Sequence, residues 1–144
     1  MECSLQLFHP VAEALITYTT DGAVPTRASS PYWGSPILLT ATTVVRARAF
    51  TAGNVGSDVV THTFLIDEQF TLPVVSIATD PPNLWDDEIG IYVEGNDRNY
   101  LKDWERPASI EFFETDGELG FASDIGLEIH GGWSRRLPQK SLAI

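Results

Sequence analysis

Strict alternation along residues 43–50 constrains the fold more than any other feature of this sequence. Val45 and Ala47 project to one side of an extended chain, whereas Arg46 and Arg48 project to the other. Throughout the first half, short β-branched and aromatic runs alternate with turn residues, and helical periodicity is absent. The pattern predicts half-buried antiparallel strands, with both arginines facing water.

Further strands are expected at residues 15–20, 37–39 and 59–66. Asp21-Gly22 ends the first of them, because glycine reaches positive φ without a Cβ clash. Several short strands in about 60 residues are typical of a small antiparallel sandwich. Residues 1–66 are therefore predicted to form such a sandwich.

The charge of the chain is divided unevenly between its two halves. The formal net charge is −11, with three Arg and Lys against four Asp and Glu in residues 1–66, and six against sixteen in 67–144. This shift in composition predicts a module boundary near Asp67. The acidic balance also disfavours nucleic acid as a partner, since phosphate backbones are bound by positive fields.

Residues 67–144 are expected to form a second strand-rich unit, so that the chain is mainly β. Strands are predicted at residues 72–77, 108–113, 120–121 and 125–129, with a hairpin turn at Asp116-Gly117. Between the first two strands lies a long acidic loop. We expect large rings to anchor it by burying apolar area; these rings are Trp85, Tyr92, Tyr100 and Trp104.

Neither a membrane nor a redox compartment is indicated by the sequence. No run of 18 or more apolar residues is present, and the first residues lack the basic start and apolar stretch of a secretory signal. If the protein is exported, its signal is expected upstream. Cys3 is the single cysteine, so it is expected to be a free thiol, with interchain pairing as the alternative.

The end of the chain has a composition suited to phosphate. Ser134, Arg135 and Lys140 follow the glycine pair at 131–132. Glycines let the backbone approach an anion, arginine offers a bidentate fork and lysine a point charge. The spacing is not that of a P-loop, and an ordinary solvated hairpin is the alternative.

The acidic loop at residues 80–97 is a weak candidate for calcium. Asp86, Asp87 and Glu88 supply the hard oxygens that calcium prefers, but the regular spacing of a calcium loop is missing. A solvated acidic loop is the alternative. The histidines are isolated in sequence, which disfavours a metal site built on them.

The first half resembles the chitobiase/β-hexosaminidase C-terminal-type domain. Residues 16–26, Ser30-Pro31-Tyr32 and 43–49 follow its pattern of a YTtDGs-Pt segment, a tyrosine and a tvrAra segment. The resemblance implies an immunoglobulin- or fibronectin-like β-sandwich that accompanies catalytic domains in exported bacterial proteins, usually without chemistry of its own.

The second half, from about residue 70 to 144, resembles the start of the CotH family, the atypical secreted kinases related to spore-coat protein H. Seven segments fall in the order of that family: 72–77, 83–86, 90–93, 104–107, 111–113, 131–135 and 138–142. The resemblance implies an incomplete N-terminal part of a kinase-like α+β domain. The parent would transfer phosphate from ATP, with a divalent metal, to Ser or Thr of extracellular or envelope proteins.

That family places its catalytic and metal-binding aspartates later in the domain than Ile144. The resemblance therefore implies no catalytic residue in this chain, no activity and no bound cofactor for it alone, and a nucleotide-phosphate role for Lys140, Arg135 and Ser134. It also implies an extracellular or cell-envelope location.

A non-catalytic binding or adhesion module is the alternative function. Its partner would be a carbohydrate or a protein, held through Tyr32, Trp33 and Trp85, because exposed aromatic rings stack on sugar faces. Unpaired strand edges could also let the chain associate with itself.

Overall fold

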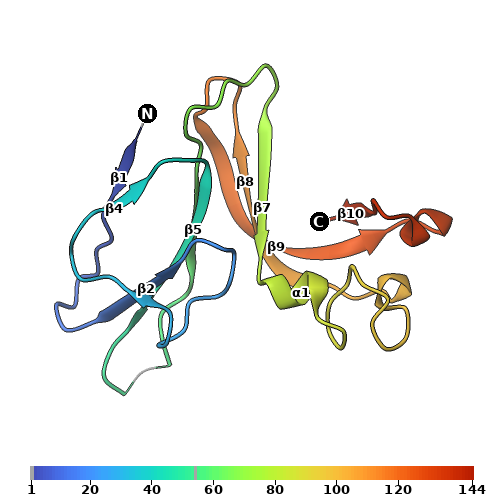
Figure 1. Cartoon of the computed structure of the whole chain (residues 1–144), viewed down its shortest axis with the longest axis horizontal. Coiled ribbons are helices and arrows are strands. Elements are labelled where there is room, and N and C mark those ends of the chain that lie inside the picture. The colour runs from blue at the N-terminus through green and yellow to red at the C-terminus, as the bar shows by residue number, and fades with distance from the viewer. Residues whose placement is uncertain (1, 54) are drawn as a thin grey trace.

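The computed structural model describes residues 2–53 and 55–144 and is mainly β, with antiparallel sheets and short helices (Figure 1). The first module contains a two-stranded sheet of β1 (Cys3–Leu5) and β4 (Ile37–Leu39). It also contains a four-stranded sheet in the order β3-β2-β5-β6. The bounds of these four strands are Ser30–Pro31, Leu15–Thr19, Thr43–Phe50 and Val60–Phe64, respectively.

These two sheets enclose the first core. Leu39, Val45 and Ile66 are buried at its centre, and Tyr18 and Phe64 pack against them. The buried side chains of β5 on this face are those that the alternation predicts, and Gly22 ends the first hairpin strand with a φ of 86°. The expectation of an antiparallel sandwich over residues 1–66 agrees with this arrangement.

The second module is a four-stranded sheet in the order β10-β9-β8-β7, also antiparallel. Its strands are β7 (Val74–Thr79), β8 (Arg106–Phe113), β9 (Leu119–His130) and β10 (Ser141–Ala143). Where two short strands were expected, at 120–121 and 125–129, β9 is a single strand of 12 residues. It pairs with β8 from Leu119 to Leu127, so Ser123 and Asp124 continue the ladder instead of interrupting it.

Short helices and the acidic loop cover the lower part of this sheet. The loop contains α1 (Pro81–Trp85) and the 3₁₀-helix η1 (Asn99–Leu101), and a second 3₁₀-helix, η2 (Trp133–Arg136), precedes β10. Ile91 from the loop is buried against the sheet, and Tyr100 is 7% exposed. Tyr92 and Trp104 pack on the same core, so three of the four predicted ring anchors are buried or pack against it, whereas Trp85 is 57% exposed.

The two modules meet where β6 lies over β8, and the contact is polar. The Glu111 carboxylate on β8 is 3% exposed and accepts a hydrogen bond of 2.7 Å from the Thr63 backbone N–H. Its other oxygen lies 2.6 Å from Nδ1 of His62, and the hydroxyls of Thr63 and Ser76 are 2.7 Å apart. A carboxylate of the second module therefore satisfies the edge strand of the first.

The prediction that both arginines face water is wrong for Arg46, which is 7% exposed. Its Nη1 donates to the Gly22 carbonyl at 2.8 Å. Burial lowers the pKa of the Arg46 guanidinium, an effect that the charges of Asp80 and Asp124 oppose. The second face of β5 is turned toward the other module instead of solvent, which alternation alone cannot reveal.

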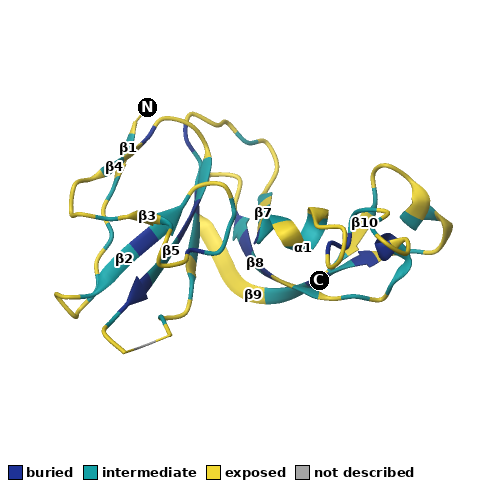
Figure 2. Cartoon of the chain, turned by 60° about the horizontal axis from the view of Figure 1, so that its bottom comes forward, coloured by how far each residue is buried: buried dark blue, intermediate teal, exposed yellow. Residues whose placement is uncertain are grey.

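Figure 2 shows that burial changes along β9. Residues 119–124 are exposed, whereas Leu127 and Ile129 are each 1% exposed in the second core. One continuous strand thus runs from the junction to the loop-covered core.

Removing the junction carboxylate should destabilise the fold. Glu111→Ala leaves the buried Thr63 N–H without an acceptor, so the free energy of unfolding should fall by about 1–3 kcal/mol in urea titrations. Glu118→Ala, at an exposed position of the neighbouring hairpin, is the control. Equal stabilities of the two variants would contradict the role given to Glu111.

Candidate binding groove and basic turn

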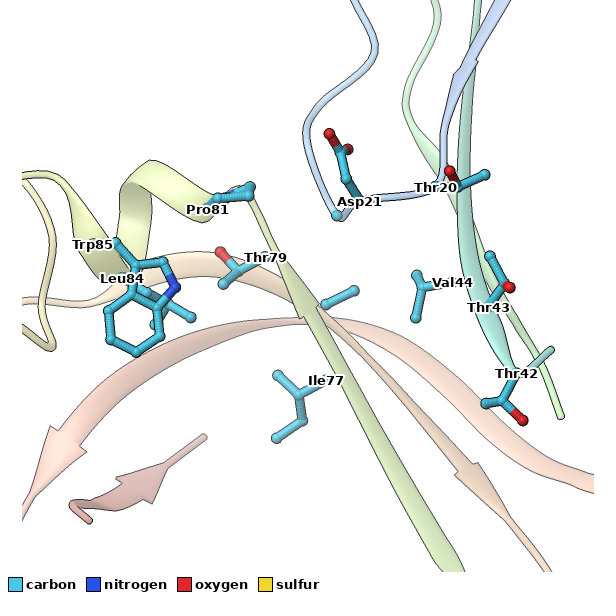
Figure 3. A pocket seen from close by; sticks show the side chains of 12 residues that line it. Thr20, Asp21, Thr42, Thr43, Val44, Ile77, Thr79, Pro81, Leu84 and Trp85 are labelled. Atoms are coloured by element: carbon cyan, nitrogen blue, oxygen red, sulfur yellow. The ribbon is translucent and has the colours of Figure 1, made fainter. Parts of the chain in front are cut away.

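A groove of about 410 Å³ lies between the two modules. Figure 3 shows β7 and α1 on one side of it and the beginning of β5, with the turn after β2, on the other. Threonine hydroxyls, small apolar side chains, one carboxylate and one indole surround the space. The lining residues are Thr20, Asp21, Gly22, Thr42, Thr43, Val44, Ile77, Ala78, Thr79, Pro81, Leu84 and Trp85.

Local hydrogen bonds shape the turn that forms one wall. The Thr19 hydroxyl donates to the Ala23 carbonyl at 2.6 Å, and the Ala23 N–H donates to Oδ1 of Asp21 at 3.0 Å. Gly22 adopts the positive φ that this tight turn requires. With the Arg46 bond to Gly22, these contacts fix the Asp21 side chain at the rim (Figure 3).

The other wall is held to the first by Asp80, the residue before α1. Its side chain makes no capping bond to the helix. Oδ1 of Asp80 instead accepts a 3.0 Å hydrogen bond from the Val24 backbone N–H in the first module. The start of the helix and the turn after β2 are therefore linked directly.

Trp85 is the one large ring on the groove walls. It ends α1, and its ring lies 5.1 Å from that of Tyr92 at 57°. The side chain is nevertheless 57% exposed. Within the helix, the amide of Asn83 donates to the Thr79 hydroxyl at 2.8 Å, which fixes the first turn against β7. The ring is thus supported on one side and open on the other.

The other two aromatic candidates lie elsewhere. Tyr32 and Trp33 follow β3, and Trp33 is 81% exposed. Neither residue lines the groove with Trp85. The structure therefore separates the three rings that the sequence grouped.

Arg135 of the basic turn is held by protein groups. Its Nε donates to the Gly131 carbonyl at 2.6 Å and its Nη1 to the Leu101 carbonyl at 3.2 Å. Asp103 pairs with the same guanidinium at 2.9 Å, and the side chain is 13% exposed. This arginine ties η2 to the end of the acidic loop.

The side chains of Lys140 and Ser134 are held by fewer contacts than that of Arg135. The Lys140 N–H donates to the Tyr92 hydroxyl at 2.9 Å, and its ammonium donates to the Leu137 carbonyl at 2.7 Å. That ammonium lies 4.6 Å from the centre of the Tyr100 ring. Ser134 is partly exposed in η2, and a Cβ at Gly131 would collide with its hydroxyl. Within the described residues, no carboxylate pairs with Lys140.

The calcium candidates do not gather around one point. Oδ1 of Asp86 accepts hydrogen bonds from the Glu88 and Ile89 N–H groups, at 2.8 and 3.1 Å, and so stabilises a turn. Asp87 and Glu88 are exposed. Across residues 2–53 and 55–144, no three His, Cys, Asp or Glu side chains are placed to hold a metal ion. Calcium in this loop stays a prediction.

Comparison with known protein families finds a match in the first module. Residues 2–61 match the family model of the chitobiase/beta-hexosaminidase C-terminal domain. This chitobiase-type match covers the β-sandwich and ends within β6. No curated protein and no solved structure matches the chain. The comparisons give no support to a CotH-type part in residues 70–144, which stays a prediction.

Sequence reasoning missed the groove and the junction. The groove joins residues 20–22, 42–44 and 77–85, and only Trp85 was singled out from it. Glu111 carried no signal beyond being a charged residue in an apolar strand-like run. In the described part of the chain, no helix has the length and apolar character needed to cross a membrane.

Arg135 should prove structural. Arg135→Lys retains the charge but cannot reach both carbonyls and Asp103, so unfolding should become easier by about 1–2 kcal/mol in chemical denaturation. The neighbouring, exposed Arg136 provides a matched substitution, Arg136→Lys, which should change stability by less than about 0.5 kcal/mol. If both variants keep wild-type stability, Arg135 does not hold the turn.

Proposed function

We propose that this chain is a non-catalytic accessory module that binds carbohydrate in the groove between its two sheets. The observation that carries the proposal is Trp85, a ring 57% exposed on the wall of a concave surface. Sugar rings pack on such faces, because their C–H surfaces are apolar while their hydroxyls need polar partners. On the opposite wall the Thr20 hydroxyl can act as such a partner, whereas Thr42 and Thr43 donate theirs to protein oxygens (Figure 3).

The chitobiase-type match supports a carbohydrate over a protein partner, since that family is associated with carbohydrate-active proteins. The dimensions agree with this choice. A space of about 410 Å³ suits a single extended chain and is too small for a folded domain. Such a module would hold an exported enzyme or surface protein near its polysaccharide, outside the cell or in the envelope.

Trp85→Ala should weaken binding of the preferred glycan about tenfold or more, because a loss of about 1.4 kcal/mol corresponds to a factor of ten. The measurement is calorimetric titration of soluble oligosaccharides identified by glycan-array screening. Trp33→Ala is the control, since it removes an even more exposed indole outside the groove. Equal losses in both variants, or a loss only in Trp33→Ala, would place the site elsewhere.

A second proposal concerns the longer protein in which residues 70–144 would open a CotH-type kinase domain. Lys140 favours it, because its ammonium has no carboxylate partner among the described residues and lies beside the concave turn of residues 137–141. ATP and a divalent metal would bind the complete domain, and the phosphate acceptor would be Ser or Thr of an extracellular protein. In this proposal Lys140 contacts phosphate, Ser134 can add a hydroxyl, and Arg135 shapes the turn.

In that longer protein, Lys140→Ala should weaken ATP binding about tenfold, since a charge-assisted bond contributes on the order of 1.5–3 kcal/mol. Isothermal titration of ATP in the presence of Mg²⁺ measures the effect, with Arg136→Ala as the neighbouring basic control. The present chain alone should show no ATP turnover above buffer. Unchanged affinity in folded Lys140→Ala would leave this residue as part of the surface.

A further inference from the structure

One carboxylate lines the groove, and three others lie near its walls. Asp21 lines it, and Glu68 accepts a hydrogen bond of 3.1 Å from the hydroxyl of the lining residue Thr42. On the opposite side, Asp80 precedes α1 and Asp86 directly follows Trp85. A ligand resting on the indole therefore lies in a negative field.

The groove itself contains no basic side chain, since no lysine or arginine is among its lining residues. The Arg46 guanidinium lies beneath the turn, is 7% exposed, and donates to the Gly22 carbonyl. It offsets Asp80 and Asp124, which it attracts, but presents no donor at the surface. Asp21 and Glu68 are left without a comparable cation within the described residues.

We infer that the groove selects glycans with free amino groups, that is, chains of 2-amino-2-deoxy sugars in their ammonium form, and rejects polyanionic glycans. The inference rests on the proposed carbohydrate function of the same groove. One Asp21 oxygen accepts from the Ala23 N–H, which orients the carboxylate and leaves its second oxygen for a ligand cation. An ammonium at the rim and a sugar ring on Trp85 satisfy both features of the site at once.

Opposite charge also increases the local concentration of such a chain before contact. A repeating ammonium is attracted by the whole molecule, whose net charge is −11, whereas a uronic-acid polymer is repelled. The attraction between exposed groups is screened by salt over about 8–10 Å, so the preference must depend on ionic strength. Stacking on Trp85 does not carry this dependence.

The test uses four β-1,4-linked hexasaccharides of glucosamine, N-acetylglucosamine, glucose and mannuronic acid. Titrations at about pH 5.5 keep ordinary aspartates ionised and the amine protonated. Glucosamine hexamer should bind about threefold to fivefold more tightly than the neutral hexamers at low salt, and mannuronate most weakly. Asp21→Asn retains an acceptor for the Ala23 N–H and should remove most of this advantage.

Asp58→Asn, an exposed aspartate outside the groove, should leave the order of affinities unchanged. Raising NaCl to about 0.5 M should reduce the glucosamine advantage. Neutral hexamers that bind through Trp85 with no ammonium advantage would overturn this inference while leaving the carbohydrate function intact. Binding of none of the glycans would overturn the carbohydrate function, and this inference with it. Equal effects of Asp21→Asn and Asp58→Asn would show only general attraction, and would overturn the role of Asp21.

Discussion

The buried carboxylate of Glu111 is the contact on which the arrangement of the two modules depends. β6 is an edge strand, so some of its amides point away from its own sheet and need acceptors. One of them, that of Thr63, finds its acceptor on β8, and His62 occupies the second oxygen. A charged group almost free of solvent is tolerated only when it is hydrogen-bonded in this way. The same contact protects the edge and aligns the sheets.

The geometry of the groove follows from that alignment and from Asp80. The junction sets how the sheets face each other at β6 and β8, and the Asp80–Val24 bond repeats the link at the start of α1. Trp85 ends this helix outside both hydrophobic cores, which are centred on Val45 and Leu127. Its exposure is therefore a result of how the modules are joined rather than of loose packing in either one.

Local patterns allowed much of the strand structure to be predicted. The alternation in β5 and the glycine turns after Asp21 and Asp116 depend on near neighbours, so they can be interpreted from the sequence. What could not be predicted depends on contacts between distant residues. Arg46 was expected in water because nothing local indicates that a second sheet covers it, and Glu111 is distinguished only by its partners in β6.

The same contrast between near neighbours and distant contacts applies to the candidate sites. Composition singled out Trp85 and Lys140, and in the structure the Trp85 ring is 57% exposed and the Lys140 ammonium has no carboxylate partner in the described chain. Ligand binding by either residue stays a prediction. It did not indicate that Arg135 is occupied by two carbonyls and Asp103, because the Leu101 carbonyl and Asp103 come from a segment that is distant in sequence. The residues that form the wall opposite Trp85 could not be predicted for the same reason, because they too are distant from it in sequence.

The distance along the chain between β6 and its acceptor has a consequence during synthesis. Thr63 and Glu111 are 48 residues apart, so a ribosome that adds about 5–20 residues per second takes roughly 2–10 s to supply the carboxylate after the strand. During that interval the first module can fold, but its edge strand has an unsatisfied amide, and Arg46 is not yet covered by the second sheet. Nascent chains are then open to pairing with one another, and slower translation of residues 64–111 would lengthen that exposure.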